Sequence, residues 1–565
     1  MTKQDIVQFL KAQLGKGYLR HSEPIPGQVW VEIRPEATVQ AVELLHRQTD
    51  ARYLMSVGSD ERELKDRFGV YHLFTFDQQH FFVTLDVSAD PKKPRLPSIT
   101  PVIAGANWSE REIRDLLGVE FDGHPDPRRL VLSDDWPQGV HPLRRDFDYS
   151  AKPPSKPENA YPFKDNPPGT TVVAMGPYFP VFEEATYFRL YVEGEQVVDV
   201  DYRGFYAHRG IEKLGDASLT YNQIPFIAER ICGICGFVHN VSFCKLVEHA
   251  SGITVPRRAD YIRVIMLELE RIHSHALWLG VAGHIIGFDT VLMQTWRMRE
   301  PIMWLCEKLT GNRKTYGMNL IGGVRRDIPK ALVPEIRKKI QAMDKEWRAV
   351  LDAVKDDTTL RMRLEKVGIL TKDQCHEWAA VGPVARAADL PMDARKDHPY
   401  CAYDAVDFKV ITADSNDVWG RTIVRILETI ESFKIVYQSL DALMELPEGD
   451  IITEIREDIP AGRIAISAVE APRGEDVHFL LTGGDNRPYR WRVRCPTYPN
   501  LPTVQVMVKG EQVADVPIIL GSIDPCFSCT ERMEVCDVST GSIKVYSQEE
   551  LFNWTKNRRE RFETV

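Results

Sequence analysis

Long hydrophobic runs are absent from this sequence. The most apolar stretch, residues 276–293 (ALWLGVAGHIIGFDTVLM), is interrupted by His284 and Asp289, whereas a membrane-spanning helix needs about 20 largely apolar residues. We therefore expect a buried helix here. The first residues, MTKQDIVQFLKAQLGKG, contain no apolar core, no small-residue cleavage site and no twin arginine, so they do not read as an export signal. These absences predict a cytoplasmic protein that reaches a membrane only through a partner.

An excess of positive charge is absent as well, and cysteine is scarce. The formal net charge of −10 argues against a nucleic-acid partner or an anionic membrane surface. Ten cysteines in 565 residues do not indicate the disulfide framework of a secreted protein. Hydrophobic residues make up 43% of the chain, which suffices for a sizeable core, and the length predicts two or three domains.

The first 149 residues predict a small α+β domain. Residues 38–48 have the spacing of a helix with one apolar face. Residues 70–76 and 80–87 are rich in aromatic and β-branched side chains and are joined by a short polar segment, as in a hairpin.

A short helix is expected after this hairpin, in the segment NWSEREIRDLLG. Ser109 and Glu112 have the spacing of a capping box at its start, and Gly118 can end it. Ile113, Leu116 and Leu117 would form its apolar face.

The segment 150–170 is rich in proline and polar residues and has no periodicity, which predicts a linker. Residues 187–203 resemble a hairpin. Helical periodicity marks three later segments, residues 256–280, 334–354 and 419–443. We therefore expect the second domain, residues 171–532, to be mainly helical, with some strand at its start and near its end.

Four of the cysteines form the two C-x-x-C pairs of the sequence. Cys232 and Cys235 lie in RICGICGFVH, and Cys526 and Cys529 lie in DPCFSCTER. Two such turns can supply four thiolates to one metal ion, but the pairs of a structural zinc site usually lie much closer together. Structural zinc, unrelated buried cysteines and a catalytic site for a soft metal all remain open on spacing alone. Arginines flank both pairs, as expected where buried negative charge needs balancing.

Four motifs together resemble the [NiFe]-hydrogenase large subunits. RICGICGFVH, EAPRGEDVH, RCPTYPNLP and DPCFSCTER occur in the order of that family, and the resemblance covers residues 171–532. HRGIEKL, LERIHSHAL and NLIGGVRRDI are similar to the complex-I-related branch, group 4. The first domain resembles the 30-kDa subunit of complex I, through residues 108–136 and 141–147. This layout is that of the formate hydrogenlyase type, and it implies a mainly helical second domain like the complex I 49-kDa subunit.

The resemblance implies a centre of nickel and iron, the iron carrying one carbon monoxide and two cyanides. Cys232 and Cys526 would be terminal ligands of nickel, and Cys235 and Cys529 would bridge the two metals. The implied reaction is the reversible reduction of two protons to H₂, with H₂ evolution as the expected direction in a formate hydrogenlyase-type complex.

Further roles follow from the same motifs. Pro472, Arg473 and Thr497 match positions that hydrogen-bond the cyanides. Arg473 would also assist H₂ cleavage or release, supported by Asp524. The role of Thr497 rests on its place in the motif, because a lone threonine would more often be a surface hydroxyl.

Two more residues complete the expected site. Glu184 matches the proton-relay glutamate of the family, with Glu183 as the alternative because one sequence does not fix the register. His239 lies four residues after Cys235, on the same face of a helix that begins there, and we expect it near the cofactor as a hydrogen-bonding residue.

The partners and the processing are implied in the same way. The chain lacks further clustered cysteines for an iron–sulfur cluster, so electrons would leave through a small iron–sulfur subunit resembling the complex I 20-kDa subunit. Other iron–sulfur subunits, a formate dehydrogenase and integral membrane subunits would hold the protein at the cytoplasmic face of the inner membrane. A nickel-dependent protease would cut between Arg532 and Met533 and remove residues 533–565.

Two alternatives belong to other classes. A subunit of the complex I 49-kDa type would shape a quinone pocket without a metal, although that lineage has lost the four cysteines. A scaffold held together by zinc would have no activity of its own. Metal content discriminates among the three.

Overall fold

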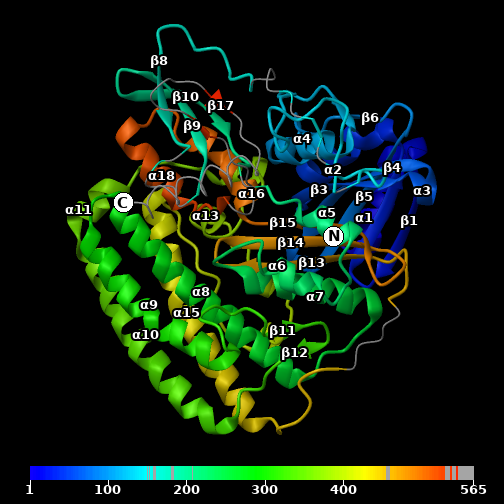
Figure 1. Cartoon of the computed structure of the whole chain (residues 1–565). Helices are drawn as coiled ribbons and strands as arrows, with labels where there is room; N and C mark the ends of the chain where they lie inside the picture. The colour runs from blue at the N-terminus through cyan, green and yellow to red at the C-terminus, as the bar shows by residue number, and fades with distance from the viewer. Residues whose placement is uncertain are drawn as a thin grey trace, which may run out of the picture.

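The computed structural model describes residues 1–148, 150–151, 153–154, 156, 161–177, 179, 184–206, 208–453, 459–527, 535–536 and 543–544. The N-terminal part forms one unit, drawn in blue, beside a larger unit of long helices and small sheets (Figure 1). None of the described helices is long and apolar enough to cross a membrane.

The first unit is built on a five-stranded sheet with the order β1-β2-β5-β4-β3. Its strands are β1 (Tyr18–Ile25), β2 (Gln28–Ile33), β3 (Arg52–Glu61), β4 (Arg67–Phe76) and β5 (Phe81–Ala89). Neighbouring strands are antiparallel except for β2 and β5. The expected hairpin is confirmed as β4 and β5.

Helices cover one face of this sheet. They are α1 (Lys3–Leu14), α2 (Thr38–Gln48) and α4 (Asn107–Leu117). Buried side chains of all three, such as Leu10, Leu45 and Ile113, share one apolar cluster with the strands. The helix expected at residues 38–48 is confirmed, because its apolar residues recur at the period that one packed face requires.

The start of α4 differs from the expectation. Ala106 is its N-cap and makes no side-chain capping bond, so Ser109 and Glu112 lie inside the helix and the predicted capping box is wrong. Gly118 ends the helix as expected, in the left-handed conformation that glycine tolerates, with φ of 77°. Glu112 is buried and bonds to the second unit.

The second unit contains two three-stranded antiparallel sheets. One consists of β8 (Thr171–Met175), β9 (Tyr187–Glu193) and β10 (Gln196–Arg203), and the other of β13 (Ile464–Ala471), β14 (Gly474–Thr482) and β15 (Pro488–Arg494). The hairpin expected at residues 187–203 is confirmed as β9 and β10.

Long helices form the other part of this unit. They are α7 (Gly236–Ser251), α8 (Arg257–Ile285), α9 (Asp289–Thr310), α10 (Val333–Asp356) and α15 (Val418–Glu445), and the last four lie side by side in Figure 1. The three segments with helical periodicity are confirmed as α8, α10 and α15. The second unit therefore combines helices with sheets, and the architecture of the chain is mixed.

One expected helix is wrong. The apolar stretch 276–293 is divided between the end of α8 at Ile285 and the start of α9 at Asp289. Gly287 lies between them with φ of 83°, a conformation that lets the chain reverse at low cost.

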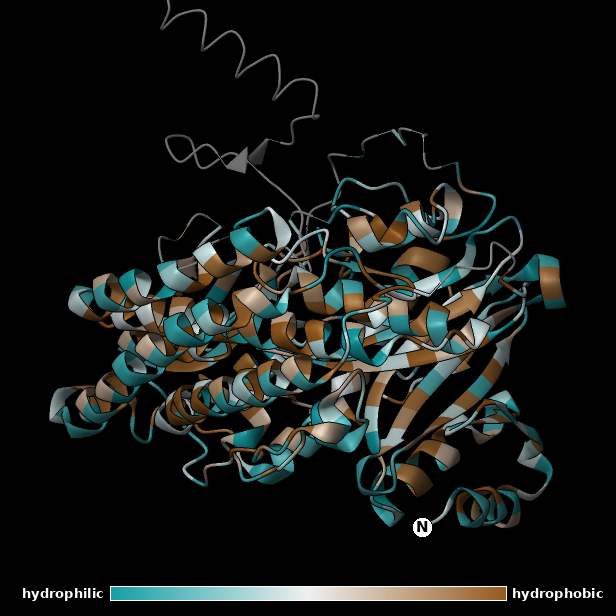
Figure 2. Ribbon diagram, turned by 90° about the horizontal axis from the view of Figure 1, so that it is seen from below, coloured by the Kyte–Doolittle hydropathy of each residue, from teal (hydrophilic) through white to brown (hydrophobic). Residues whose placement is uncertain are grey.

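The two units share an apolar core. The free face of the first sheet packs on β13, β14 and β15, with Trp30, Val57 and Leu73 meeting Ile466 and Phe479. All ten residues of β3 and all ten of β4 are consequently buried. Burial of both faces is expected for a sheet covered on both sides. The helices of the molecule carry both hydrophilic and hydrophobic residues (Figure 2).

Candidate metal centre

The segments that carry the two cysteine pairs meet in the structure. Cys232 lies in the loop after α6 (Ile224–Ala228), and Cys526 follows α18 (Val516–Ser522). Their sulfur atoms are 3.3 Å apart, although 294 positions separate them in the sequence. Cys235, directly before α7, belongs to the same buried cluster. The structure thus brings together three of the four predicted ligands.

The three thiols form a donor set that suits a soft metal. All three thiols are buried. The backbone amides of Ile234 and Cys235 donate to Cys232 Sγ at 3.3 and 3.2 Å, which stabilises a thiolate. The hydrogen bond with Cys232, burial and the repulsion between neighbouring thiolates all raise the pKa of Cys235. A divalent metal ion would relieve that repulsion, so these residues fit nickel.

Arg473 and Asp524 form an ion pair beside the sulfur atoms. Arg473 donates from Nε to the Asp524 backbone carbonyl at 2.7 Å, and its Nη2 lies 2.9 Å from Asp524 Oδ1. Burial alone would lower the pKa of Arg473, but the charges of Asp524 and of the cysteines raise it well above its usual value. Nη1 has no hydrogen-bond partner within the described residues. Nη1 of Arg473 is therefore available as a hydrogen-bond donor.

Pro472 and Thr497 lie in two buried loops next to this pair. Pro472 separates β13 from β14, and Thr497 begins the short helix α16 (Thr497–Asn500). Thr497 Oγ1 accepts a hydrogen bond from the backbone amide of Cys526 at 3.1 Å. Since a hydroxyl can accept and donate at once, the Thr497 hydroxyl keeps its own proton for a further acceptor.

His239 joins a buried cluster with Asp476 and His478, which the sequence interpretation missed. Nδ1 of His239 lies 3.3 Å from Asp476 Oδ1, and Nε2 of His478 lies 3.1 Å from Asp476 Oδ2. Burial would lower the pKa of His239, but the charge of Asp476 raises it to about 9. The cluster is compact enough for a metal ion, and we interpret it as an ion pair because the Asp476 carboxylate lies between the two imidazoles. The alternation of Asp476 and His478 along β14 was the available signal.

Two further residues hold the first cysteine pair and were also missed. Glu270 of α8 accepts the backbone amides of Phe237 and Val238 at 3.0 and 3.1 Å, in the first turn of α7. Tyr316 donates its hydroxyl to the Cys232 carbonyl at 2.9 Å. A carboxylate on first-turn amides fixes where a helix begins. A glutamate on the buried face of α8 was the signal in the sequence.

Of the remaining predicted residues, the structure describes only Glu184. Glu184 lies in the loop between β8 and β9 and is half-buried. Glu183, Cys529, Arg532 and Met533 lie outside the described residues. The register of the relay glutamate, the fourth ligand and the cleavage site therefore stay predictions.

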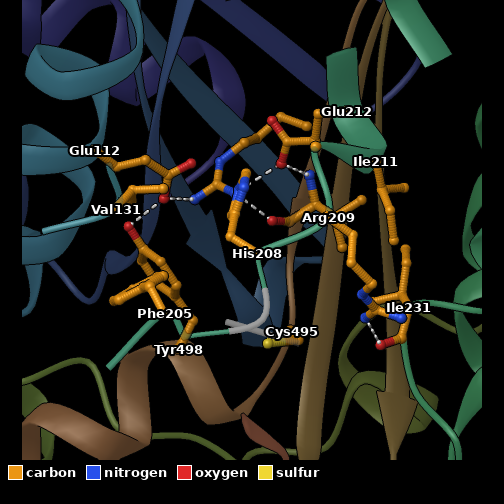
Figure 3. Close-up of a pocket in the computed structure, with 13 residues that line it drawn as sticks. Glu112, Val131, Phe205, His208, Arg209, Ile211, Glu212, Ile231, Cys495 and Tyr498 are labelled. Atoms are coloured by element: carbon orange, nitrogen blue, oxygen red, sulfur yellow. Dashed lines mark hydrogen bonds and ion pairs between the residues drawn. The ribbon is translucent and has the colours of Figure 1, made fainter. Parts of the chain in front are cut away.

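A small pocket lies between the first unit and the motif loops (Figure 3). Its volume of about 70 Å³ leaves room for a few water molecules. Its walls include Glu112 of α4, Ile231, which precedes Cys232, and Cys495 after β15. Tyr498 also lines it and donates its hydroxyl to Glu112 Oε2 at 2.5 Å. The first unit thus reaches the segments on which the candidate metal centre is built.

Three protein-family models match the chain. The 30 Kd subunit of respiratory-chain NADH dehydrogenase matches residues 31–153, and the 49 Kd subunit matches residues 286–465 and 451–532. The nickel-dependent hydrogenase family matches residues 209–285, which contain the first cysteine pair. The expected order of a 30-kDa-like part followed by a 49-kDa-like part is confirmed.

Curated relatives match the whole chain. Formate hydrogenlyase subunit 5 of Escherichia coli (strain K12) is 39% identical and is covered over 99% of both chains. Hydrogenase-4 component G of the same strain is 39% identical over 98% of this chain and 97% of that one. A chain of the membrane-bound sulfane sulfur reductase, an archaeal respiratory membrane complex, superposes with a TM-score of 0.61 and 28% identity, covering 64% of this chain and 99% of that chain.

Proposed function

This chain belongs to the hydrogenase family of formate hydrogenlyase subunit 5 and hydrogenase-4 component G, and on that premise we propose that its paired cysteines hold a nickel–iron centre. The chain is the large subunit of a [NiFe]-hydrogenase and interconverts two protons and two electrons with H₂. The contact between the Cys232 and Cys526 sulfur atoms beside Arg473 is the observation that carries the proposal.

The ligands divide into two kinds in this proposal. Cys232 and Cys526 would hold nickel, and Cys235 and Cys529 would hold both metals. The iron would also carry one carbon monoxide and two cyanides. When bound, the centre supplies the two-electron chemistry of H₂, while the protein supplies binding, orientation and electrostatics.

Arg473 orients its charge at this centre. Its hydrogen bond and its ion-pair contact with Asp524 fix the plane of the guanidinium. Nη1 would then be the donor available to the reacting species. A fixed cation in a site that excludes water acts more strongly than the same charge in solution. Asp524 supports the reaction by holding Arg473.

The two loops that carry Arg473 and Thr497 would supply hydrogen-bond donors to the cyanides. Thr497 has a hydroxyl proton to give because its oxygen accepts from the Cys526 amide, and Pro472 and Arg473 form the wall on the other loop. His239, held by Asp476, contributes positive charge near the cysteines. These roles for Pro472, Arg473 and Thr497 rest on their motif positions and on their burial beside Cys526.

Protons and electrons take separate routes. Glu184, in the loop before β9, is the proposed proton acceptor for the Cys526 thiol. Electrons pass to a small iron–sulfur subunit of the complex I 20-kDa type. Other iron–sulfur subunits, a formate dehydrogenase and integral membrane subunits complete the complex, so the chain lies peripherally at the cytoplasmic face of the inner membrane.

Maturation ends with proteolysis in this proposal. A nickel-dependent protease cuts between Arg532 and Met533 and releases residues 533–565, after which the second cysteine pair lies at the new C-terminus. Mass spectrometry of the mature subunit should find a chain ending at Arg532. Active enzyme that still ends at Val565 contradicts this step.

Metal analysis and infrared spectroscopy test the proposal. The purified complex should contain about one nickel per chain and show the stretching bands of metal-bound carbon monoxide and cyanide. Cys526→Ser should abolish H₂ turnover because the remaining ligands no longer balance the metal charge. Cys375→Ser, at a buried free cysteine of α12 (Lys372–Glu377) outside the motifs, is the matched control and should keep turnover. Stoichiometric zinc with unaffected activity would support a scaffold, and a metal-free active complex would support a quinone pocket.

A further inference from the structure

Two charged side chains of the first unit reach the two loops that carry Arg473 and Thr497. They are Arg52 of β3, which is 8% exposed, and Glu112 of α4, which is 7% exposed. Taking a charge out of water costs free energy unless its partners have good geometry. Such contacts therefore depend strongly on the position of both partners.

Arg52 forms hydrogen bonds with Glu475, two residues after Arg473. Its Nη1 and Nη2 donate to Glu475 Oε1 and Oε2 at 3.1 and 2.7 Å, a two-bond arrangement that fixes direction as well as distance. Arg494, the last residue of β15, donates to the same Oε1 at 2.6 Å. Arg52 also donates from Nε to Oδ2 of Asp77, within the first unit, at 2.8 Å.

The backbone between Arg473 and Glu475 has little room to move. Gly474 has φ of 129°, and a Cβ atom there would lie 2.8 Å from backbone atoms of Gly382. Only glycine fits this combination of conformation and close approach. A displacement of Glu475 is therefore passed on to Arg473.

Glu112 accepts a hydrogen bond from Tyr498, the residue after Thr497. Its Oε2 accepts from the Tyr498 hydroxyl at 2.5 Å and from Arg492 Nη2 at 2.9 Å. Figure 3 shows the Glu112 carboxylate and the Tyr498 hydroxyl directed at each other across the pocket (Figure 3). Trp108, also of α4, packs edge-on against the Tyr498 ring with centroids 5.5 Å apart.

We propose that the first unit positions the hydrogenase site, with Arg52 setting the loop of Arg473 and Glu112 setting the loop of Thr497. Both are positioning residues, since each acts through a neighbour of the loop residue. The inference rests on the proposed function, because it concerns the two loops that would face the cyanides. It gives the 30-kDa-like part a role in the chemistry of the second unit beyond docking.

The test uses Arg52→Lys and Glu112→Gln in the purified complex. Lysine keeps the charge but loses the two-bond fork, and glutamine keeps an acceptor for Tyr498 but loses the charge that pairs with Arg492. H₂ evolution should fall by about 10- to 100-fold, since small misplacements at a reacting centre have effects of that size. The cyanide bands should shift while nickel content stays unchanged. Peptides spanning residues 470–476 and 495–500 should take up deuterium faster.

Arg67→Lys is the matched control. Arg67 is equally buried and pairs with Glu61 and Asp86, both inside the first unit. It should lower the melting temperature and leave the cyanide bands and both loop peptides as in the wild type.

Two results overturn the inference. One is that the bands and the deuterium uptake of Arg52→Lys and Glu112→Gln match the wild type. The other is that Arg67→Lys changes them by as much. A wild-type complex without any carbon monoxide or cyanide bands overturns the proposed function instead, and deuterium uptake, which needs no metal, then decides the positioning role alone.

Discussion

Arg473 makes one hydrogen bond and one ion-pair contact with a single residue, Asp524, and keeps one nitrogen without a partner in the described part of the chain. Asp524 adopts a left-handed backbone with φ of 56°, which is uncommon for residues other than glycine. That conformation presents both the carbonyl and the carboxylate of Asp524 to one guanidinium. Strain of this kind is typical of functional sites.

Arg473→Lys should therefore lower H₂ evolution by about 10²–10³-fold, the usual effect of removing one preorganised electrostatic donor. Lysine keeps the charge but lacks the planar fork that meets Asp524 twice. Nickel content and melting temperature should stay near the wild-type values, and H₂ evolution with an artificial electron donor is the measurement. Arg95→Lys, at the exposed Arg95–Asp122 pair of the first unit, serves as the control. Turnover within tenfold of the wild type for Arg473→Lys contradicts this role.

At the residue scale, a motif with fixed spacing indicates which distant residues to compare. Cys232, Cys235 and Cys526 converge as the motifs imply. Asp476 and His478 escaped notice because their partner, His239, comes from a distant helix, and such a pairing depends on how strand and helix pack. No local pattern carries that information.

At the scale of elements, periodicity predicted helices and failed at their ends. α2 and α8 follow from apolar residues at helical spacing, and β4 and β5 follow from runs of β-forming residues. The capping box of α4 failed because Glu112 is used by a distant partner, Tyr498. Tertiary contacts override local preferences at such positions.

Glu110, in the first turn of α4, gives this element a pH dependence. Burial raises its pKa from near 4.5 to about 7, against the hydrogen bonds from Ser98, Thr100 and the Ile99 amide. The folded state thus holds a proton that the unfolded state releases between about pH 4.5 and pH 7. The free energy of unfolding consequently falls as the pH rises through this window, and the loss ends above pH 7.

Glu110→Gln should remove that loss, on the order of 3 kcal/mol. The melting temperature of the variant relative to the wild type should rise between pH 5 and pH 8, measured by thermal unfolding at one-unit steps. Glu63→Gln, at an exposed position of α3 (Arg62–Lys65), removes the same charge from the surface and should follow the wild type. Parallel curves for Glu110→Gln and the wild type would show that Glu110 does not titrate in this window.

At the scale of the molecule, the length predicted two or three domains, but no pattern along the chain indicated that they share a core. The free face of the first sheet and the sheet of β13, β14 and β15 bury each other's apolar side chains, including Tyr71 stacked on Phe479 with centroids 5.4 Å apart. β3 and β4 consequently lack the polar alternation of a half-exposed strand. Their uninterrupted burial is visible only once both units are present.

The proline-rich linker is consequently not what joins the units. A protease site inserted within residues 150–170 and cut after purification should leave both fragments together on gel filtration. Apolar burial between the sheets should hold at 1 M salt, since salt screens exposed charges but does not weaken hydrophobic contact. Replacing Val57, buried between the sheets, with Asp should separate the cut fragments, because an unpaired charge cannot be buried there without a large cost. Separation of the cut wild-type fragments at low salt would show that the linker, and not the shared core, keeps the first unit on the site it positions.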